Sequence, residues 1–126
     1  MLLRLIVTGG KAVLQAEDDG RWKPAGIKDA NGLKPGVYIL DRAIAADVGK
    51  AYEGQILAIH KDTVYQQAGK VIVRHHAKFF PQLPGVGEWG RIDYYKEKPV
   101  VAITAATSAQ KTAAVEKKAR KLARSY

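Results

Sequence analysis

Short runs of β-branched and aromatic residues, each ended within a few positions by a turn signal, fill the chain from Leu2 to Ile103. Val, Ile and Tyr in such runs are typical of strands, and Gly, Pro, Asn and Asp between them are typical of turns. Closely spaced strands favour a meander. The predicted fold class is mainly β (α+β if helices are counted): a small antiparallel, barrel-like curled sheet with one short internal helix and a basic C-terminal helix or tail.

The turn signals set the bounds of the expected strands. Pro24 has no amide hydrogen to donate to a ladder, so the strand that contains it should lie at a sheet edge or end there. The first two strands should form a hairpin around Gly9 and Gly10. The predicted strands are residues 2–8, 11–16, 21–26, 37–40, 55–60, 63–67, 70–79, 91–96 and 100–104.

Residues 41–49 are the one internal segment with helical character. Asp41 is a suitable N-cap, because its carboxylate can accept from the free amides of a first turn. A short apolar stripe follows, and Gly49 is a suitable stop. We therefore predict a short helix over this segment.

The positive charge is concentrated at the end of the chain. The protein has a net charge of +9. Its 126 residues are enough for one domain with one core. We predict a β-rich globular domain over residues 1–104 and a basic helical tail over residues 105–126. The tail should order on a partner, with docking on the barrel as the alternative. The tail cations expected to contact nucleic acid are Lys117, Lys118, Arg120, Lys121 and Arg124.

Several classes of protein are disfavoured by composition. The chain has no cysteine, which removes disulfide frameworks and thiolate chemistry. Its first ten residues lack the pattern of a signal peptide, and no stretch is long and apolar enough to span a bilayer. We therefore expect a cytoplasmic protein without a membrane partner.

Residues 70–78 alternate between apolar and basic side chains. In a strand, Val71, Val73 and His75 share one face, which should point inward. Lys70, Arg74, His76 and Lys78 share the opposite face, which should be exposed. The two adjacent histidines therefore point in opposite directions and cannot act as a catalytic pair.

The basic face is the candidate nucleic-acid site. Lys70, Arg74, His76 and Lys78 would contact phosphates, with Tyr65 on the neighbouring strand as a stacking platform. The alternative is a solvated polar face without a ligand. For His75, the simplest reading is a partly buried histidine bonded to the backbone, and a specific binding role is the alternative.

Catalytic and metal-binding patterns are absent from the sequence. His60 and His75 could meet only through strand pairing, with Asp62 or Asp93 completing a site, and no spacing typical of metal ligands is present. The carboxylates fall mostly in turns, and the glycines of residues 85–90 lack the following helix that a phosphate loop needs. We predict no catalytic residue, no metal and no cofactor.

Five short motifs follow one another in residues 52–101. They are Tyr52-x-Gly54-x-Ile56, Val64-Tyr65-Gln66, Val73-Arg74-His75, Pro84-Gly85-x-Gly87 and Ile92-x-Tyr94. In this order and spacing the segment resembles the KfrB-type domain of broad-host-range plasmids, which also occurs at the end of some conjugative relaxase and mobilisation proteins. The resemblance implies that Gln66 and His75 are fixed points of the domain, whereas His76 stands where the family often has an acidic residue.

The resemblance implies a plasmid-encoded accessory protein that works with DNA-binding plasmid proteins. Combined with the charge, it predicts a non-enzymatic binding module for plasmid maintenance, segregation or conjugative transfer, which contacts nucleic acid through the basic strand face and the tail. The alternative is an adaptor that binds a DNA-bound plasmid protein or forms a homodimer through the tail. An enzyme acting on nucleotides ranks last, because Gln66, His75 and a carboxylate would have to converge in a cleft.

Overall fold

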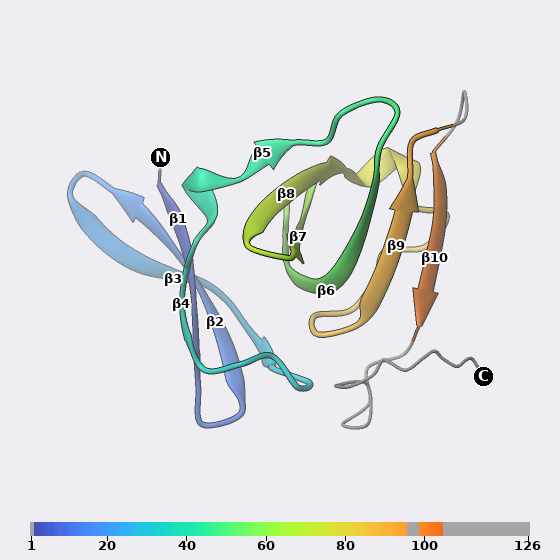
Figure 1. The fold of residues 1–126 in the computed structure, drawn as a ribbon. Helices are drawn as coiled ribbons and strands as arrows, with labels where there is room; N and C mark the ends of the chain where they lie inside the picture. The colour runs from blue at the N-terminus through green and yellow to red at the C-terminus, as the bar shows by residue number, and fades with distance from the viewer. Residues whose placement is uncertain (1, 96–98, 105–126) are drawn as a thin grey trace.

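Two β-sheets make up the described part of the protein, residues 2–95 and 99–104 of the computed structural model (Figure 1). The predicted class, mainly β with antiparallel pairing, is confirmed. The strands divide between two sheets, whereas the sequence predicts a single curled one. The predicted tail, residues 105–126, lies outside the described residues.

The first sheet holds the N-terminal strands in the order β3-β2-β1-β4. Their bounds are β1 Leu3–Thr8, β2 Lys11–Asp18, β3 Arg21–Asp29 and β4 Gly36–Ile39. The predicted first hairpin is present, with Thr8 paired to Lys11 across the turn. Gly9 and Gly10 both have positive φ, as a two-residue hairpin turn requires. β3 is an edge strand, as Pro24 predicts.

The second sheet has the order β10-β9-β6-β7-β8-β5. Its strands are β5 Ile44–Ala45, β6 Ala51–His60, β7 Thr63–Ala68, β8 Val71–His76, β9 Trp89–Asp93 and β10 Val100–Thr104. β5 pairs with β8 in parallel, and the other pairings are antiparallel. Within the described residues no pairing joins the edges β5 and β10, so the sheet curls without closing into a barrel (Figure 1).

The internal helix predicted over residues 41–49 is not formed. Leu40–Arg42 make a single 3-10 turn, η1, and the next residues pair with β8 instead. The carboxylate of Asp41, the predicted helix cap, accepts from the backbone N–H of Leu3 at 3.0 and 3.1 Å. Pairing with β8 prevails because so short a helix gains little from its own hydrogen bonds. No helical segment in the described ranges is long and apolar enough to cross a membrane.

Apolar side chains gather into two clusters, one on each face of the second sheet. The first lies between the sheets and joins residues such as Leu5 and Leu14 to Leu57 and Tyr65. The second fills the curl of the second sheet and includes Ile56, Val64, Val73 and Ile92. A bulge in β6 serves both clusters, because the extra residue Leu57 turns toward the first sheet while Ile56 stays in the curl.

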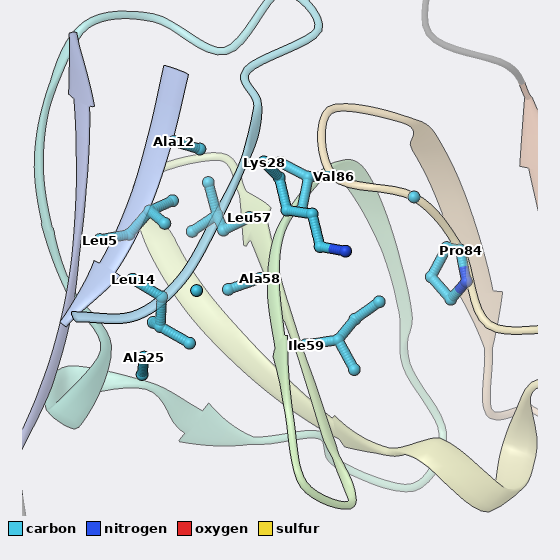
Figure 2. A pocket seen from close by; sticks show the side chains of 12 residues that line it. Leu5, Ala12, Leu14, Ala25, Lys28, Leu57, Ala58, Ile59, Pro84 and Val86 are labelled. Atoms are coloured by element: carbon cyan, nitrogen blue, oxygen red, sulfur yellow. The ribbon is translucent and has the colours of Figure 1, made fainter. Parts of the chain in front are cut away.

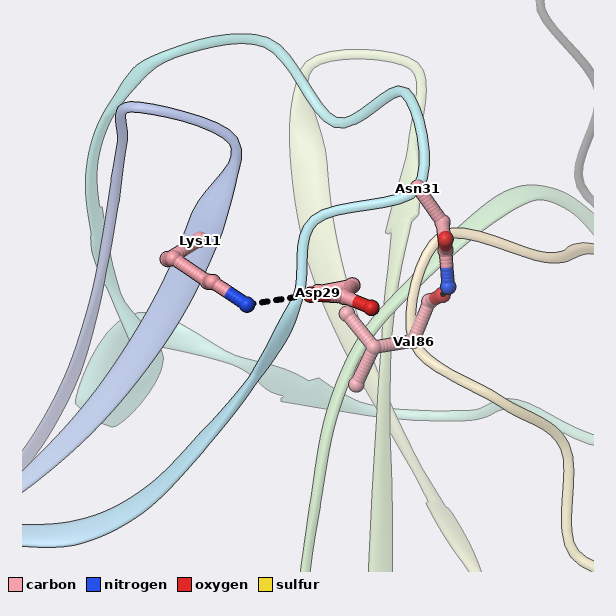
Figure 3. A network of polar contacts seen from close by, with 4 residues as sticks. All are labelled: Lys11, Asp29, Asn31 and Val86. Atoms are coloured by element: carbon pink, nitrogen blue, oxygen red, sulfur yellow. Dashed lines mark hydrogen bonds and ion pairs between the residues drawn. The ribbon is translucent and has the colours of Figure 1, made fainter.

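Polar contacts attach the first sheet to the second near residues 29–31 (Figure 3). Asp29 accepts from Nζ of Lys11 at 2.6 Å, which ties β3 to β2. Nδ2 of Asn31 then donates to the carbonyl oxygen of Val86 at 3.0 Å. Gly87 packs so closely there that a Cβ would lie 2.6 Å from the carbonyl oxygen of Ala30. The glycine-containing loop is thus a packing element between the two sheets.

Candidate nucleic-acid interface

The alternation predicted for residues 70–78 is confirmed over most of β8. Val73 and His75 are 0% and 3% exposed and face the curl, whereas Arg74 and His76 are exposed on the other face. Val71 is an exception: it is exposed because it follows the hairpin turn at the start of the strand. The adjacent histidines therefore point in opposite directions, as predicted.

His75 belongs to a chain of buried hydrogen bonds inside the second sheet. Its Nδ1 lies 2.6 Å from the hydroxyl of Tyr94, and its Nε2 lies 2.8 Å from Oε1 of Gln66. Nε2 of Gln66 donates in turn to the carbonyl oxygens of Gly54 at 3.2 Å and Gly90 at 2.8 Å. The prediction that His75 bonds to the backbone is therefore wrong, because its partners are two side chains.

These contacts fix the proton positions along the chain. The Gln66 amide nitrogen faces two carbonyl oxygens, so Oε1 must be the acceptor for His75. The neutral imidazole therefore carries its proton on Nε2, and its Nδ1 accepts from the Tyr94 hydroxyl. Hydrogen bonds thus satisfy both ring nitrogens.

Burial holds both titratable members of the chain neutral. It lowers the pKa of His75 from 6.5 to about 4. It also raises the pKa of Tyr94 to about 12, with a smaller contribution from Tyr52. A general base works best with a pKa near the operating pH. His75 is far from that condition, and its position suits a structural role.

The basic face of β8 continues into the 3-10 turn η2, Ala77–Phe79. We call Lys70, Arg74, His76 and Lys78 the β8 cationic face; all four are exposed. Nη1 of Arg74 donates to the carbonyl oxygen of Ala43 at 2.6 Å. Nζ of Lys78 lies 5.4 Å from the centre of the Phe79 ring. Within the described residues, none of these four side chains is in a salt bridge.

The predicted stacking platform is wrong. Tyr65 pairs with Arg74 across the strands, but the residue is only 9% exposed and packs in the first cluster. The alternation of side chains along the strand could not reveal that Tyr65 is buried, because the first sheet covers part of the outer face of the second. Of the adjacent tyrosines Tyr94 and Tyr95, the first is buried and the second is 67% exposed. The tail residues Lys117, Lys118, Arg120, Lys121 and Arg124 lie outside the described residues.

A hollow of about 270 Å³ opens beside this face, where β5 ends along β8. Thr63, Arg74 and His76 bring polar groups to it, and His75, Tyr94 and Phe79 form its floor and wall. Ala45 and Ala46 complete the lining. The sequence did not predict this hollow. The hollow forms because β5 is only two residues long and ends beside β8, and this pairing cannot be read from the sequence.

A second cavity, of about 230 Å³, lies between the two sheets and is lined mostly by apolar side chains (Figure 2). Leu14 and Leu57 approach it from opposite sheets, and Lys28 reaches over it. It lies away from the β8 cationic face. Among the described residues, no three His, Asp or Glu side chains form a group that could hold a metal ion.

We call the buried hydrogen bonds that join Tyr94, His75 and Gln66 to Gly54 and Gly90 the histidine chain. All of its residues lie in one segment, which begins at β6 and reaches into β10. Residues 51–103 match the KfrB domain family. The match confirms the resemblance stated for residues 52–101, and it supports a plasmid-related function. Gly54, Gln66, His75, Gly90 and Tyr94 all lie within the KfrB segment, as does the whole β8 cationic face. The chain has no match among curated proteins.

Proposed function

We propose that this protein is a non-enzymatic binding module of a plasmid maintenance, segregation or conjugative transfer system, and that it contacts nucleic acid through the β8 cationic face. The KfrB segment supplies the plasmid setting. The net charge of +9 favours an acidic partner. The proposed location is cytoplasmic, where plasmid DNA resides.

One observation carries the nucleic-acid proposal: the charged heads on β8 and η2 are held in place without carboxylate partners. Arg74 is fixed by the carbonyl oxygen of Ala43, and Lys78 lies over Phe79. Neither is in a salt bridge within the described part of the chain. Side chains already held lose less conformational freedom on binding. The face is therefore suited to contacting phosphates.

The non-enzymatic part of the proposal rests on the histidine chain. An enzyme acting on nucleotides would need Gln66, His75 and a carboxylate around one reacting atom. The two side chains do meet, but the third member is Tyr94. The low pKa of His75 leaves it a poor base.

A salt titration tests the proposal. Fluorescence anisotropy with labelled single- and double-stranded DNA should show affinity that falls as salt rises, with a slope of about 0.9 per neutralised phosphate on duplex DNA. The double variant Arg74→Gln/Lys78→Gln should lower both affinity and slope. The control Arg21→Gln/Lys23→Gln removes the same charge from exposed positions of β3 and should retain the slope. Equal losses in both variants, or no DNA binding at low salt, would contradict the proposal.

Removal of residues 105–126 tests the predicted contribution of the tail. Six basic side chains and one acidic side chain lie in this segment. Loss of DNA affinity with the oligomeric state unchanged would support the tail as a nucleic-acid contact. Loss of a dimer or of a protein partner would favour the adaptor alternative.

The adaptor alternative is favoured by the exposed edge of the first sheet. β3 has a partner strand on one side, and Ile27 on it is 62% exposed. Such an edge can accept a strand from another protein. A pull-down from cells that carry the parent plasmid, with and without nuclease, separates the two functions: a partner retained after nuclease treatment supports the adaptor, whereas one released by it supports nucleic-acid binding.

A further inference from the structure

The hollow beside β8 lies where the strand edge loses its partner. Ala45 of β5 is paired with Arg74, and the backbone N–H of Ala46 donates to the carbonyl oxygen of Arg74 at 3.3 Å. Backbone groups of alternate residues point to the same edge of a strand. The N–H of His76 is therefore directed to this edge, just beyond the end of β5. It brings a backbone donor to the rim of the hollow.

Side-chain donors surround the same opening. Arg74 uses one N–H of its guanidinium on Ala43, which leaves four others and fixes the orientation of the group. Nδ1 of His76 accepts from the backbone N–H of Lys78 at 3.1 Å, so the neutral ring carries its proton on Nε2. Thr63, which carries a hydroxyl, lies on the neighbouring strand β7 and is the residue paired directly with His76.

The residues that line the hollow carry no negative charge. None of its lining residues is Asp or Glu. Lys78 adds a second positive charge next to the wall residue Phe79. The floor adds no charge of its own, because His75 and Tyr94 are neutral and bonded to each other. A cluster of N–H and O–H donors with no carboxylate in its lining is complementary to an oxyanion.

The size of the hollow limits its ligand. At about 270 Å³ it falls just below the usual range for pockets that enclose a whole drug-sized ligand. It has room for a phosphate group with part of its sugar. The surrounding basic face would hold the rest of a nucleic-acid strand outside the hollow.

We propose that this hollow is a phosphate-binding site in which Arg74, His76 and Thr63 hold one phosphate group of the bound nucleic acid. This inference rests on the proposed function and deepens it by naming the contact. Arg74 supplies the charge and a forked pair of donors, and His76 and Thr63 supply neutral donors. The phosphate can be a terminal monoester or a diester within a strand, and the experiment distinguishes the two.

The test is an NMR titration of the full chain at constant ionic strength. The probes are inorganic phosphate and two oligonucleotides of one sequence, with a 5′-phosphate or a 5′-hydroxyl. Each should shift the backbone amide signals of Thr63, His75 and His76. Tighter binding of the phosphorylated oligonucleotide assigns a terminal monoester, and equal binding assigns a diester.

Variants separate the hollow from the rest of the face. Arg74→Gln should weaken phosphate binding about tenfold, as expected for loss of a charge-assisted pair of hydrogen bonds. Thr63→Val keeps the shape of the side chain and should weaken binding less, about threefold for one neutral donor. Arg21→Gln, at an exposed position of β3 in the first sheet, is the control and should leave phosphate binding unchanged.

Two outcomes tell the failure of this inference from the failure of the proposed function. DNA binding that leaves the amides of Thr63, His75 and His76 unshifted would overturn the phosphate site and leave the proposed function standing. Shifts with inorganic phosphate but no DNA binding would contradict the proposed function and uphold the site. Dispersed amide spectra of each variant establish that it is folded.

Discussion

Nε2 of His75 lies 2.8 Å from Oε1 of Gln66, and this contact joins β8 to β7 through side chains on the inner face of the sheet. Gln66 extends the connection to the backbone of β6 and β9, through Gly54 and Gly90. A single amide thus links four strands of the KfrB segment. Its surroundings are the apolar side chains of the second cluster, where an unpaired polar group has a high free-energy cost.

Replacing Gln66 should destabilise the fold strongly. Gln66→Leu preserves the size of the side chain but leaves the buried Nε2–H of His75 without a partner and removes the hydrogen bonds that the Gln66 amide donates to Gly54 and Gly90. We expect the free energy of unfolding to fall by about 2–4 kcal/mol. Urea denaturation followed by tryptophan fluorescence measures it. Gln67→Leu is the matched control, because that amide bonds to Gly69 in an exposed turn; its change should stay within about 0.5 kcal/mol. Equal losses would refute the assigned role.

The buried histidine should make stability depend on pH. The pKa of His75 is about 4 in the folded protein and 6.5 in the unfolded chain. Between these values the unfolded chain binds a proton that the folded protein does not. The contribution of neutral His75 to the free energy of unfolding is therefore complete above about pH 6.5. It is lost as the pH falls toward 4, and the total loss is about 3 kcal/mol.

The variant His75→Gln isolates this contribution. It should be less stable than the native protein at neutral pH, because Tyr94 loses its acceptor. Its free energy of unfolding should nevertheless fall less steeply with acid, since the titrating group is gone. The free energies of unfolding of the native protein and the variant are measured by urea denaturation at several pH values. Subtracting one from the other cancels the contribution of the titrating groups that the two proteins share. Parallel profiles would show that His75 titrates normally in the folded protein.

Strand positions and face assignments were accessible from the sequence because they depend on local patterns. Apolar alternation in residues 71–76 correctly placed Val73 and His75 inside. Paired glycines placed the first hairpin. These signals lie within a few residues of the structure that they determine, so no knowledge of distant contacts was needed.

Other features depend on contacts between distant parts of the chain, and the sequence could not fix them. The helix predicted over residues 41–49 is not formed, because Ile44 and Ala45 pair with β8, about thirty residues later in the sequence. Tyr65 was placed on the correct face but wrongly expected to be exposed, because the first sheet covers it. The partnership of His75 with Tyr94 spans two strands and a loop, and no local pattern predicts it.

A glycine-to-alanine exchange at position 54 should be severely destabilising. A Cβ there would overlap the backbone carbonyl oxygen of Gln67, and backbone atoms cannot move aside cheaply. We expect Gly54→Ala to cost more than about 3 kcal/mol or to prevent folding. Gly26→Ala is the control, because a Cβ on that residue of β3 meets nothing within 4 Å. Soluble yield and urea midpoints compare them, and tolerance of Gly54→Ala would contradict the tight pairing of β6 with β7.

The hydroxyl of Tyr94 should be identifiable by its own titration. Burial raises its pKa to about 12, so an absorbance titration of the folded protein should show a late phenol ionisation that disappears in Tyr94→Phe. The variant leaves Nδ1 of His75 without a donor and should lose about 1–3 kcal/mol of stability. Tyr95→Phe, at an exposed neighbouring position, should change stability by less than about 0.5 kcal/mol. If both variants lose the same amount, the hydrogen bond to His75 does not contribute to stability, and the role of the chain in joining β7, β8 and β9 must be abandoned.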